Sequence, residues 1–97
     1  MERKEPESVG DVLRSLLEQT ELQGRMKELE AIQLWPKVAG HVIADECGKP
    51  SVKNGLMTIS VPNASLRNEL HMTRSSLRRL INEHLGKETI TEIRFIS

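Results

Sequence analysis

Aromatic side chains are nearly absent from this 97-residue sequence, in which Trp35 and Phe95 are the only two. Proteins that bind single-stranded nucleic acid by base stacking present several exposed aromatic rings, so this composition argues against that mode of binding. Both residues occur within apolar patterns, and we expect them in the core. The rest of the core must come from leucine, isoleucine and valine.

Groups that support catalysis are also scarce. Cys47 is the single cysteine, so no internal disulfide can form, and we expect it to be a small buried residue at a helix end. His41, His71 and His84 have no metal-ligand spacing with one another or with Cys47. The sequence contains neither a glycine-rich phosphate loop nor the GxxG loop with which KH domains clamp a nucleic-acid backbone. We therefore expect no enzyme, no cofactor, no metal and no small-molecule substrate.

Long hydrophobic runs are missing as well. No uninterrupted apolar stretch exceeds three residues, far below the ~20 residues that cross a membrane, and the first residues lack the apolar region of a signal peptide. The length is that of one domain. These features predict a cytoplasmic protein with no membrane partner, in which residues 1–7 are a frayed lead-in and residues 8–97 form a single domain.

The charged residues balance, with fourteen Lys and Arg against fourteen Asp and Glu, and the net charge is zero. This is not the polycation typical of a nonspecific nucleic-acid binder. The total hides a division, because residues 1–48 hold six cations and ten anions, a net charge of −4, while residues 49–97 hold eight cations and four anions, a net charge of +4. The sequence therefore predicts an acidic N-terminal half and a basic C-terminal half.

The N-terminal half has the apolar period of helices. Ser8 and Asp11 have the spacing of a capping box, which predicts that ordered structure begins at Ser8. Thr20 opens a similar signal and Pro36 interrupts the period, so we expect a second helix from Thr20 and favour a third, from Pro36 to about Glu46, over a single kinked helix. The apolar stripe after the first cap consists of Val9, Val12, Leu13, Leu16 and Leu17, and a second stripe consists of Leu22, Met26 and Leu29.

The C-terminal half has the pattern of strands around one helix. Predicted strands at about 50–53 and 56–61 flank Asn54-Gly55, a dipeptide typical of type I′ hairpins. Asn63 is placed to cap a long helix over residues 63–86 that Gly86 ends. Its apolar stripe consists of Leu66, Leu70, Leu77, Leu80, Ile81 and Leu85. Residues 89–96 are rich in β-formers and predict a third strand.

This order predicts an α+β fold with two to three N-terminal helices, a β-hairpin, a long helix and a third strand. We expect the helices to cover one face of a three-stranded sheet. The long crossover helix makes the second and third strands run in the same direction. The sequence does not decide which strands are neighbours in the sheet. We favour a position of the third strand beside the first, which would make every pairing antiparallel.

One stripe of the predicted 63–86 helix carries four hydrogen-bond donors at the spacing i, i+4, i+7 and i+11, namely Arg67, His71, Arg74 and Arg78. Such a row can grip a phosphate backbone or an acidic protein surface, although charges on a helix are also typical of a merely solvated face. With the cations that flank the strands, the candidate nucleic-acid-binding set is Lys49, Lys53, Arg67, His71, Arg74, Arg78 and Arg94. We expect His84, beside the apolar stripe, to be satisfied by a hydrogen bond.

Five segments together resemble the DciA-like family of bacterial proteins. They are Trp35 to Gly40, Lys49-Pro50, Asn54 to Val61, Ala64 to Leu70, and Leu85-Gly86 with Ile93 to Phe95. The resemblance implies a KH-like fold, affinity for DNA and a role as loader or operator of the replicative DnaB-type helicase. Members were long regarded as a domain of unknown function or as RNA-binding proteins. The family often has an aromatic residue where this sequence has Leu66, so a contact that depends on that ring does not transfer.

We therefore expect a non-enzymatic, nucleic-acid-associated adaptor. It binds single-stranded or double-stranded DNA weakly through the basic helix, with RNA as an alternative ligand and the replicative helicase as the partner that the resemblance implies. The alternative is a protein-interaction module without a direct nucleic-acid role, in which the acidic and basic halves contact other proteins or each other.

Overall fold

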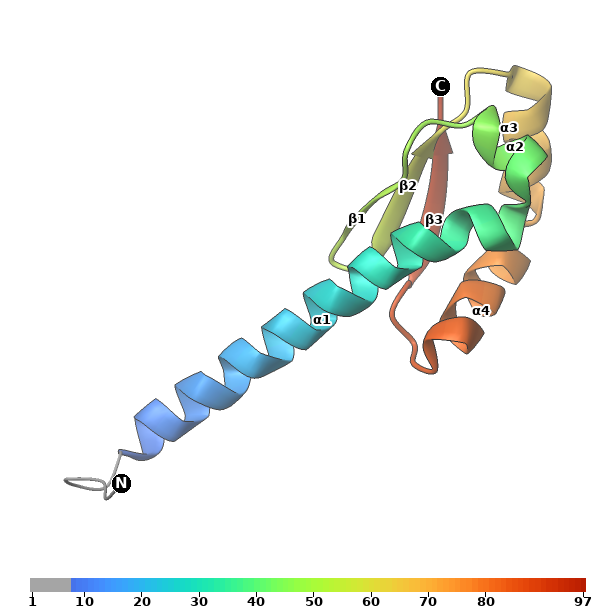
Figure 1. Ribbon diagram of the computed structural model, residues 1–97. Helices are drawn as coiled ribbons and strands as arrows, with labels where there is room; N and C mark the ends of the chain where they lie inside the picture. The colour runs from blue at the N-terminus through green and yellow to red at the C-terminus, as the bar shows by residue number, and fades with distance from the viewer. Residues whose placement is uncertain (1–7) are drawn as a thin grey trace.

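Seven elements make up residues 8–97, the part of the chain that the structure describes (Figure 1). The structure is a computed structural model, and the lead-in expected at residues 1–7 lies outside the described residues. The elements are α1 (Val9–Ala39), α2 (His41–Asp45), β1 (Ser51–Lys53), β2 (Leu56–Ser60), α3 (Ala64–Met72), α4 (Arg74–Leu85) and β3 (Glu92–Ile96).

Helix α1 begins where its cap predicts. The Ser8 Oγ accepts a hydrogen bond from the Asp11 backbone N–H at 3.1 Å, which satisfies one free amide of the first turn. The helix then continues for 31 residues, so the second start expected at Thr20 is wrong. The Thr20 hydroxyl donates instead to the Leu16 carbonyl, 2.9 Å away in the same helix.

Pro36 lies inside α1, and the new helix expected to begin there is wrong. Proline removes one hydrogen bond from a helix, but the neighbouring Trp35 is fully buried and packs against Phe95, with ring centroids 5.9 Å apart. This packing holds the helix through the proline. The helix ends before Gly40, whose φ of 93° is accessible to glycine and strained for other residues.

The three strands lie in the order β1-β2-β3. β1 and β2 form the predicted hairpin, in which Asn54 and Gly55 have φ values of 52° and 84°, as a type I′ turn requires. The common direction of the second and third strands is confirmed, but β3 pairs with β2, so the expected position beside the first strand is wrong. The lengths of the edges explain this, because β1 offers three residues for pairing whereas β2 pairs with all five of β3.

The helix expected over residues 63–86 is two helices, α3 and α4. Asn63 caps α3 as predicted, its Oδ1 accepting a first-turn N–H at 2.9 Å. The break lies at Thr73, whose hydroxyl donates to two carbonyls of the preceding turn at 3.3 and 3.2 Å. The Thr73 backbone itself leaves the helical region, with φ −104° and ψ 12°. A bond of the same kind at Thr20 leaves α1 unbroken, so the hydroxyl accompanies the break and is not its sole cause. Gly86 ends α4 as predicted, in the left-handed conformation with φ 73°.

The core fills the space between the helices and one face of the sheet. Its largest fully buried side chains are Trp35, Met57, Ile59, Val61, Ile81 and Ile90. Phe95 is buried with them, which confirms the expected place of both aromatic residues, whereas Leu80 of the predicted apolar stripe is 42% exposed. The α+β class with helices on one face of the sheet is confirmed, and the KH-like assignment stays a prediction.

One polar side chain is buried with this core. Asn82 on α4 is 6% exposed and is the one buried polar side chain in the described part of the chain. Its Nδ2 donates to the Ile90 carbonyl at 2.9 Å, and its Oδ1 accepts from the backbone N–H groups of Thr89 and Ile90 at 3.1 and 2.9 Å. The side chain therefore holds the loop between α4 and β3 against the helix.

The first half of α1 projects from the rest of the molecule (Figure 1). Residues 9–23, which we call the arm, are exposed at every position but carry the predicted apolar stripe, and the molecule measures 63 × 20 × 19 Å. The helix is fixed to the domain just beyond the arm. Lys27 Nζ donates to the Leu85 carbonyl at 3.1 Å, and a Glu28 carboxylate oxygen accepts from the Gly55 N–H at 3.2 Å. These two bonds tie α1 to the end of α4 and to the hairpin turn.

Candidate nucleic-acid interface

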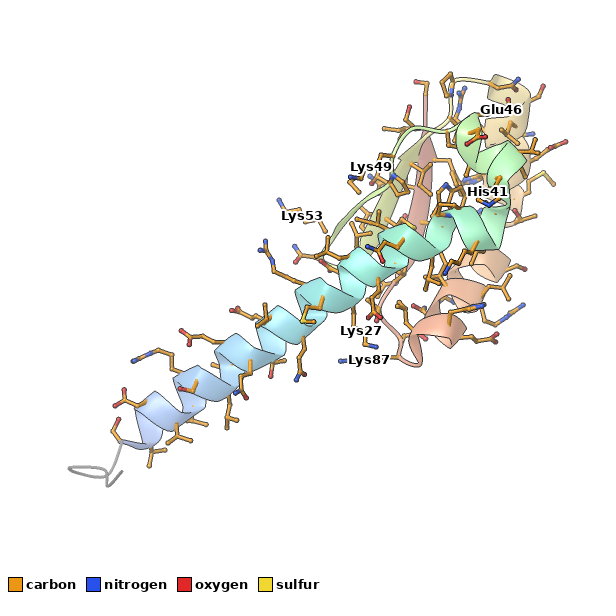
Figure 2. All side chains as sticks on the ribbon, viewed as in Figure 1. Lys27, His41, Glu46, Lys49, Lys53 and Lys87 are labelled. Carbon is orange, nitrogen blue, oxygen red and sulfur yellow. The ribbon has the colours of Figure 1, made fainter. Side chains whose placement is uncertain are left out.

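The seven predicted site residues divide between two sides of the molecule. Four lie on or beside the α3–α4 helix pair and three lie at the sheet. Arg94 alternates with the buried Ile93 and Phe95 along β3, so its side chain points to the face of the sheet that the helices leave open. Lys49 and Lys53 lie on the β1 side of the molecule, away from α3 and α4 (Figure 2). The fold therefore does not bring the predicted set together on one face.

The predicted basic stripe is interrupted where its helix is interrupted, at Thr73. Arg67 is half-buried and its Nη1 donates to the Val61 carbonyl at 2.7 Å, while the Arg74 Nη1 donates to the His71 carbonyl at 2.7 Å. Both guanidinium groups thus donate to backbone carbonyls, one just after β2 and one near the end of α3. A guanidinium has five N–H donors, so each keeps donors for a ligand, but its position is set by the protein.

Arg78 has a carboxylate partner. Its Nη1 lies 2.7 Å from the Glu88 Oε2, and this contact fastens the loop after α4. The Glu88 side chain is 70% exposed, so solvent screens the pair and its contribution to stability is small. Sequence reasoning missed Arg79 and Lys87, which lie exposed beside this pair. Their signal was available, since Arg79 follows Arg78 directly.

The open face of the sheet combines cations with small hydroxyl side chains. Ser51 pairs in register with Thr58, and Thr58 pairs with Arg94, so these three lie in one row across the strands. Lys53 is exposed at the end of β1. Arg94 Nη2 lies 3.7 Å from Glu92 Oε2, but both side chains are more than half exposed, so the pair is weak. Lysine, arginine and hydroxyl groups are the donors that proteins use for phosphate oxygens.

The remaining reactive groups of residues 8–97 form no recognisable catalytic or metal-binding arrangement. The Cys47 thiol is half-buried, and its pKa is raised, first by burial and then by the nearby Glu46 carboxylate. His84 Nδ1 lies 2.9 Å from the Leu80 carbonyl, as expected for a histidine satisfied within its own helix. Within residues 8–97, no three His, Cys, Asp or Glu side chains are grouped as a metal site requires. None of the described helices has both the length and the apolar composition of a membrane span.

Comparison with known proteins gives a family match over nearly the whole chain. A family model described as "Dna[CI] antecedent, DciA" matches residues 8–95. The chain is 22% identical over 91 residues to a "UPF0232 protein" of Mycolicibacterium paratuberculosis, which covers 94% of this chain and 50% of the relative. It is 24% identical over 93 residues to a "UPF0232 protein in recF-gyrB intergenic region" of Mycolicibacterium smegmatis, which covers 96% of this chain and 48% of the relative. The chain thus spans about half the length of these curated relatives.

Proposed function

The chain belongs to the DciA family, and on this basis we propose that it is a non-enzymatic adaptor that associates with DNA and with a DnaB-type replicative helicase. The family match over residues 8–95 is the observation that carries the proposal. The division of charge along the sequence supports it, because an acidic half suits a basic protein surface and a basic half suits a polyanion. An adaptor of this kind needs no reactive group.

For the DNA contact, the open face of the sheet is the stronger of the two candidate surfaces. Lys53 and Arg94 are exposed on this face, and the Ser51 and Thr58 hydroxyls lie in one row with Arg94. Lys49 is exposed just before β1. The predicted basic helix supplies a second, weaker surface, since its arginines already hold acceptors of the protein itself. Without exposed aromatics or a GxxG loop, either contact is electrostatic and indifferent to base sequence.

Salt dependence of DNA binding tests this proposal. If Lys53, Arg94 and the neighbouring Lys49 each neutralise one phosphate of a single strand, the slope of log affinity against log salt is about −2, and the dissociation constant at physiological salt lies in the range of roughly 10⁻⁴ to 10⁻⁶ M. Titration of a fluorescent oligonucleotide at several salt concentrations measures both. Absence of binding at low salt, or binding that does not change with salt, would exclude the DNA role.

Matched double variants assign the surface. Lys53→Ala with Arg94→Ala should reduce the slope to about −0.7, because one contacting cation is left. Arg74→Ala with Arg78→Ala removes the same charge from the basic helix and should change the slope less. The reverse ranking would place the main contact on the helices. Thermal melting of each variant checks that the fold is retained.

The alternative, a protein-interaction module without a direct DNA role, is favoured by one observation. The arm exposes several large aliphatic side chains, and such surfaces commonly bind proteins. A pull-down with the purified replicative helicase of the same organism, treated with nuclease, separates the possibilities together with the titration above. Helicase retention without DNA binding in the titration supports the alternative. Retention together with DNA binding supports the adaptor, and absence of retention rejects the helicase partner.

A further inference from the structure

The apolar stripe of the arm is not packed against any other part of residues 8–97. Its five members are exposed by between 43% and 76%: Val9, Val12, Leu13, Leu16 and Leu17. Leu13 is typical, at 54%. Together they present about 500 Å² of apolar surface, which is as large as the largest patch on most monomers. An isolated helix of this length is also marginally stable in water.

The stripe belongs to the face of α1 that builds the core. At about 100° per residue, Leu13 and the buried Ala31 lie on the same side of the helix, as do Leu17 and the buried Trp35, because each pair is eighteen residues apart. The domain covers this face from Ala31 onward and leaves it open along the arm. The arm therefore presents a core-type helix face with nothing packed on it in the described chain.

We propose that this face binds the same face of a second copy, so that two arms pair antiparallel around a two-fold axis between Val12 and Leu13. In this register Val9 packs against Leu16 of the second copy, and Val12 packs against Leu13 of the second copy. Every central contact is then aliphatic on both sides. Two stripes bury about 1,000 Å², which reaches the lower bound for a specific interface and indicates a weak, concentration-dependent dimer.

Geometry favours the antiparallel arrangement. The domain covers the same face of α1 from Ala31 onward, so parallel pairing of the arms would place both domains at the same end of the helix pair and on the same face, where they would collide. The arm also has the necessary reach. The paired segment ends at Leu17 and the domain grips α1 at Lys27, so about 15 Å of helix separates the paired segment from either domain. The two domains point to opposite ends and do not collide.

Sedimentation equilibrium of the 97-residue chain tests the proposal. Between about 10 and about 500 µM, a range suited to an interface of this size, the average mass should rise from the monomer value of 11.0 kDa toward twice that value. Leu13→Glu should keep the mass at 11.0 kDa throughout, since it sets two carboxylates beside the two-fold axis. A wild-type chain that stays monomeric at the highest concentration would overturn the proposal.

The arm itself supplies a matched control. Leu22 is 59% exposed against 54% for Leu13, and nine residues place it on the opposite side of the same helix. Leu22→Glu should therefore dimerise as the wild type does. An equal loss of dimer in the Leu13→Glu and Leu22→Glu variants would show that the stripe is not the interface. Neither residue belongs to the buried core, so the melting temperature of the dilute monomer should be unchanged in both.

Cross-linking determines the direction of the helices. In a Cys47→Ser background, Val9→Cys and Leu16→Cys proteins should form disulfide dimers when mixed and should not when each is oxidised alone. The antiparallel register places identical positions about 10 Å apart along the axis, beyond the reach of a disulfide. Dimers of each single-cysteine protein with itself would indicate parallel pairing and overturn the proposed arrangement.

Discussion

Replacement of Asn82 by alanine is the most informative perturbation of the fold. The side chain is 6% exposed and makes three hydrogen bonds to the loop between α4 and β3. Asn82→Ala leaves the N–H and the carbonyl of Ile90 without partners, and Ile90 is fully buried. Each buried orphan group costs about 1–3 kcal/mol. The half-buried Thr89 N–H adds a smaller cost.

The expected loss is therefore about 3–4 kcal/mol in the free energy of unfolding, from about 1.5 kcal/mol for each of the two Ile90 groups and less for Thr89. For a domain of this size, 1 kcal/mol corresponds to about 4–8 °C, so the melting temperature should fall by about 12–30 °C. Urea unfolding followed by circular dichroism measures the free energy, with an unchanged m-value. Amide exchange should show faster exchange of the Ile90 N–H.

Asn68→Ala is the control for this experiment. Asn68 has the same side chain on the neighbouring α3 but is exposed, so its replacement should change stability by no more than about 0.5 kcal/mol. A loss below about 1 kcal/mol in Asn82→Ala would refute the reasoning. It would mean that water or a rearranged loop satisfies the Ile90 groups at little cost.

Two further predictions concern a turn and a thiol. Gly55→Ala should lower the free energy of unfolding by about 1–3 kcal/mol, because the φ of Gly55 is 84° and a Cβ there would lie 2.9 Å from the Thr91 Oγ1. The control is Gly24→Ala in α1, where nothing lies within 4 Å of the added Cβ and helicity should increase. Equal losses of unfolding free energy in the two variants, measured by urea unfolding, would contradict this prediction. The raised pKa of Cys47, caused by burial and then by Glu46, keeps the thiol protonated at pH 8, so iodoacetamide should modify it several-fold more slowly than a free peptide thiol. Alkylation as fast as in the urea-unfolded chain would contradict that second expectation.

Local features of the fold could be predicted because nearby residues determine them. The caps at Ser8 and Asn63 and the end of a helix at Gly86 each depend on groups within four residues of one another. The Asn54-Gly55 turn depends only on two positive φ values. Signals of this range are present in the sequence itself.

Features decided by packing could not be predicted in the same way. α1 continues through Pro36 because Trp35 beside it is held in the core against Phe95, which is sixty residues away in sequence. The position of β3 depends on which strand offers the longer edge. The break at Thr73 has no local signal, because a threonine hydroxyl bonded to the preceding turn also occurs at Thr20 within the continuous α1.

The candidate site shows the same division. The sequence identifies the cations but not their acceptors, because Val61 and Glu88 approach Arg67 and Arg78 only in the folded chain. The hydroxyls of the open sheet face were also missed. Alternation along the strands contained that signal, since Ser51 and Thr58 fall on the side opposite the buried Met57.

The paired bonds of Lys27 and Glu28 to the end of α4 and to the hairpin turn make the helix ahead of them a lever. Val9 lies about 27 Å along the axis from Lys27. When the helix and the domain rotate together by 10° about Lys27, Val9 moves by about 5 Å, whereas the parts of the domain close to Lys27 tilt by the same angle but move much less. A partner that binds the arm near Val9 therefore determines the orientation of the whole domain. A spectroscopic label at Val9 would move by a large distance when the sheet tilts by a small angle.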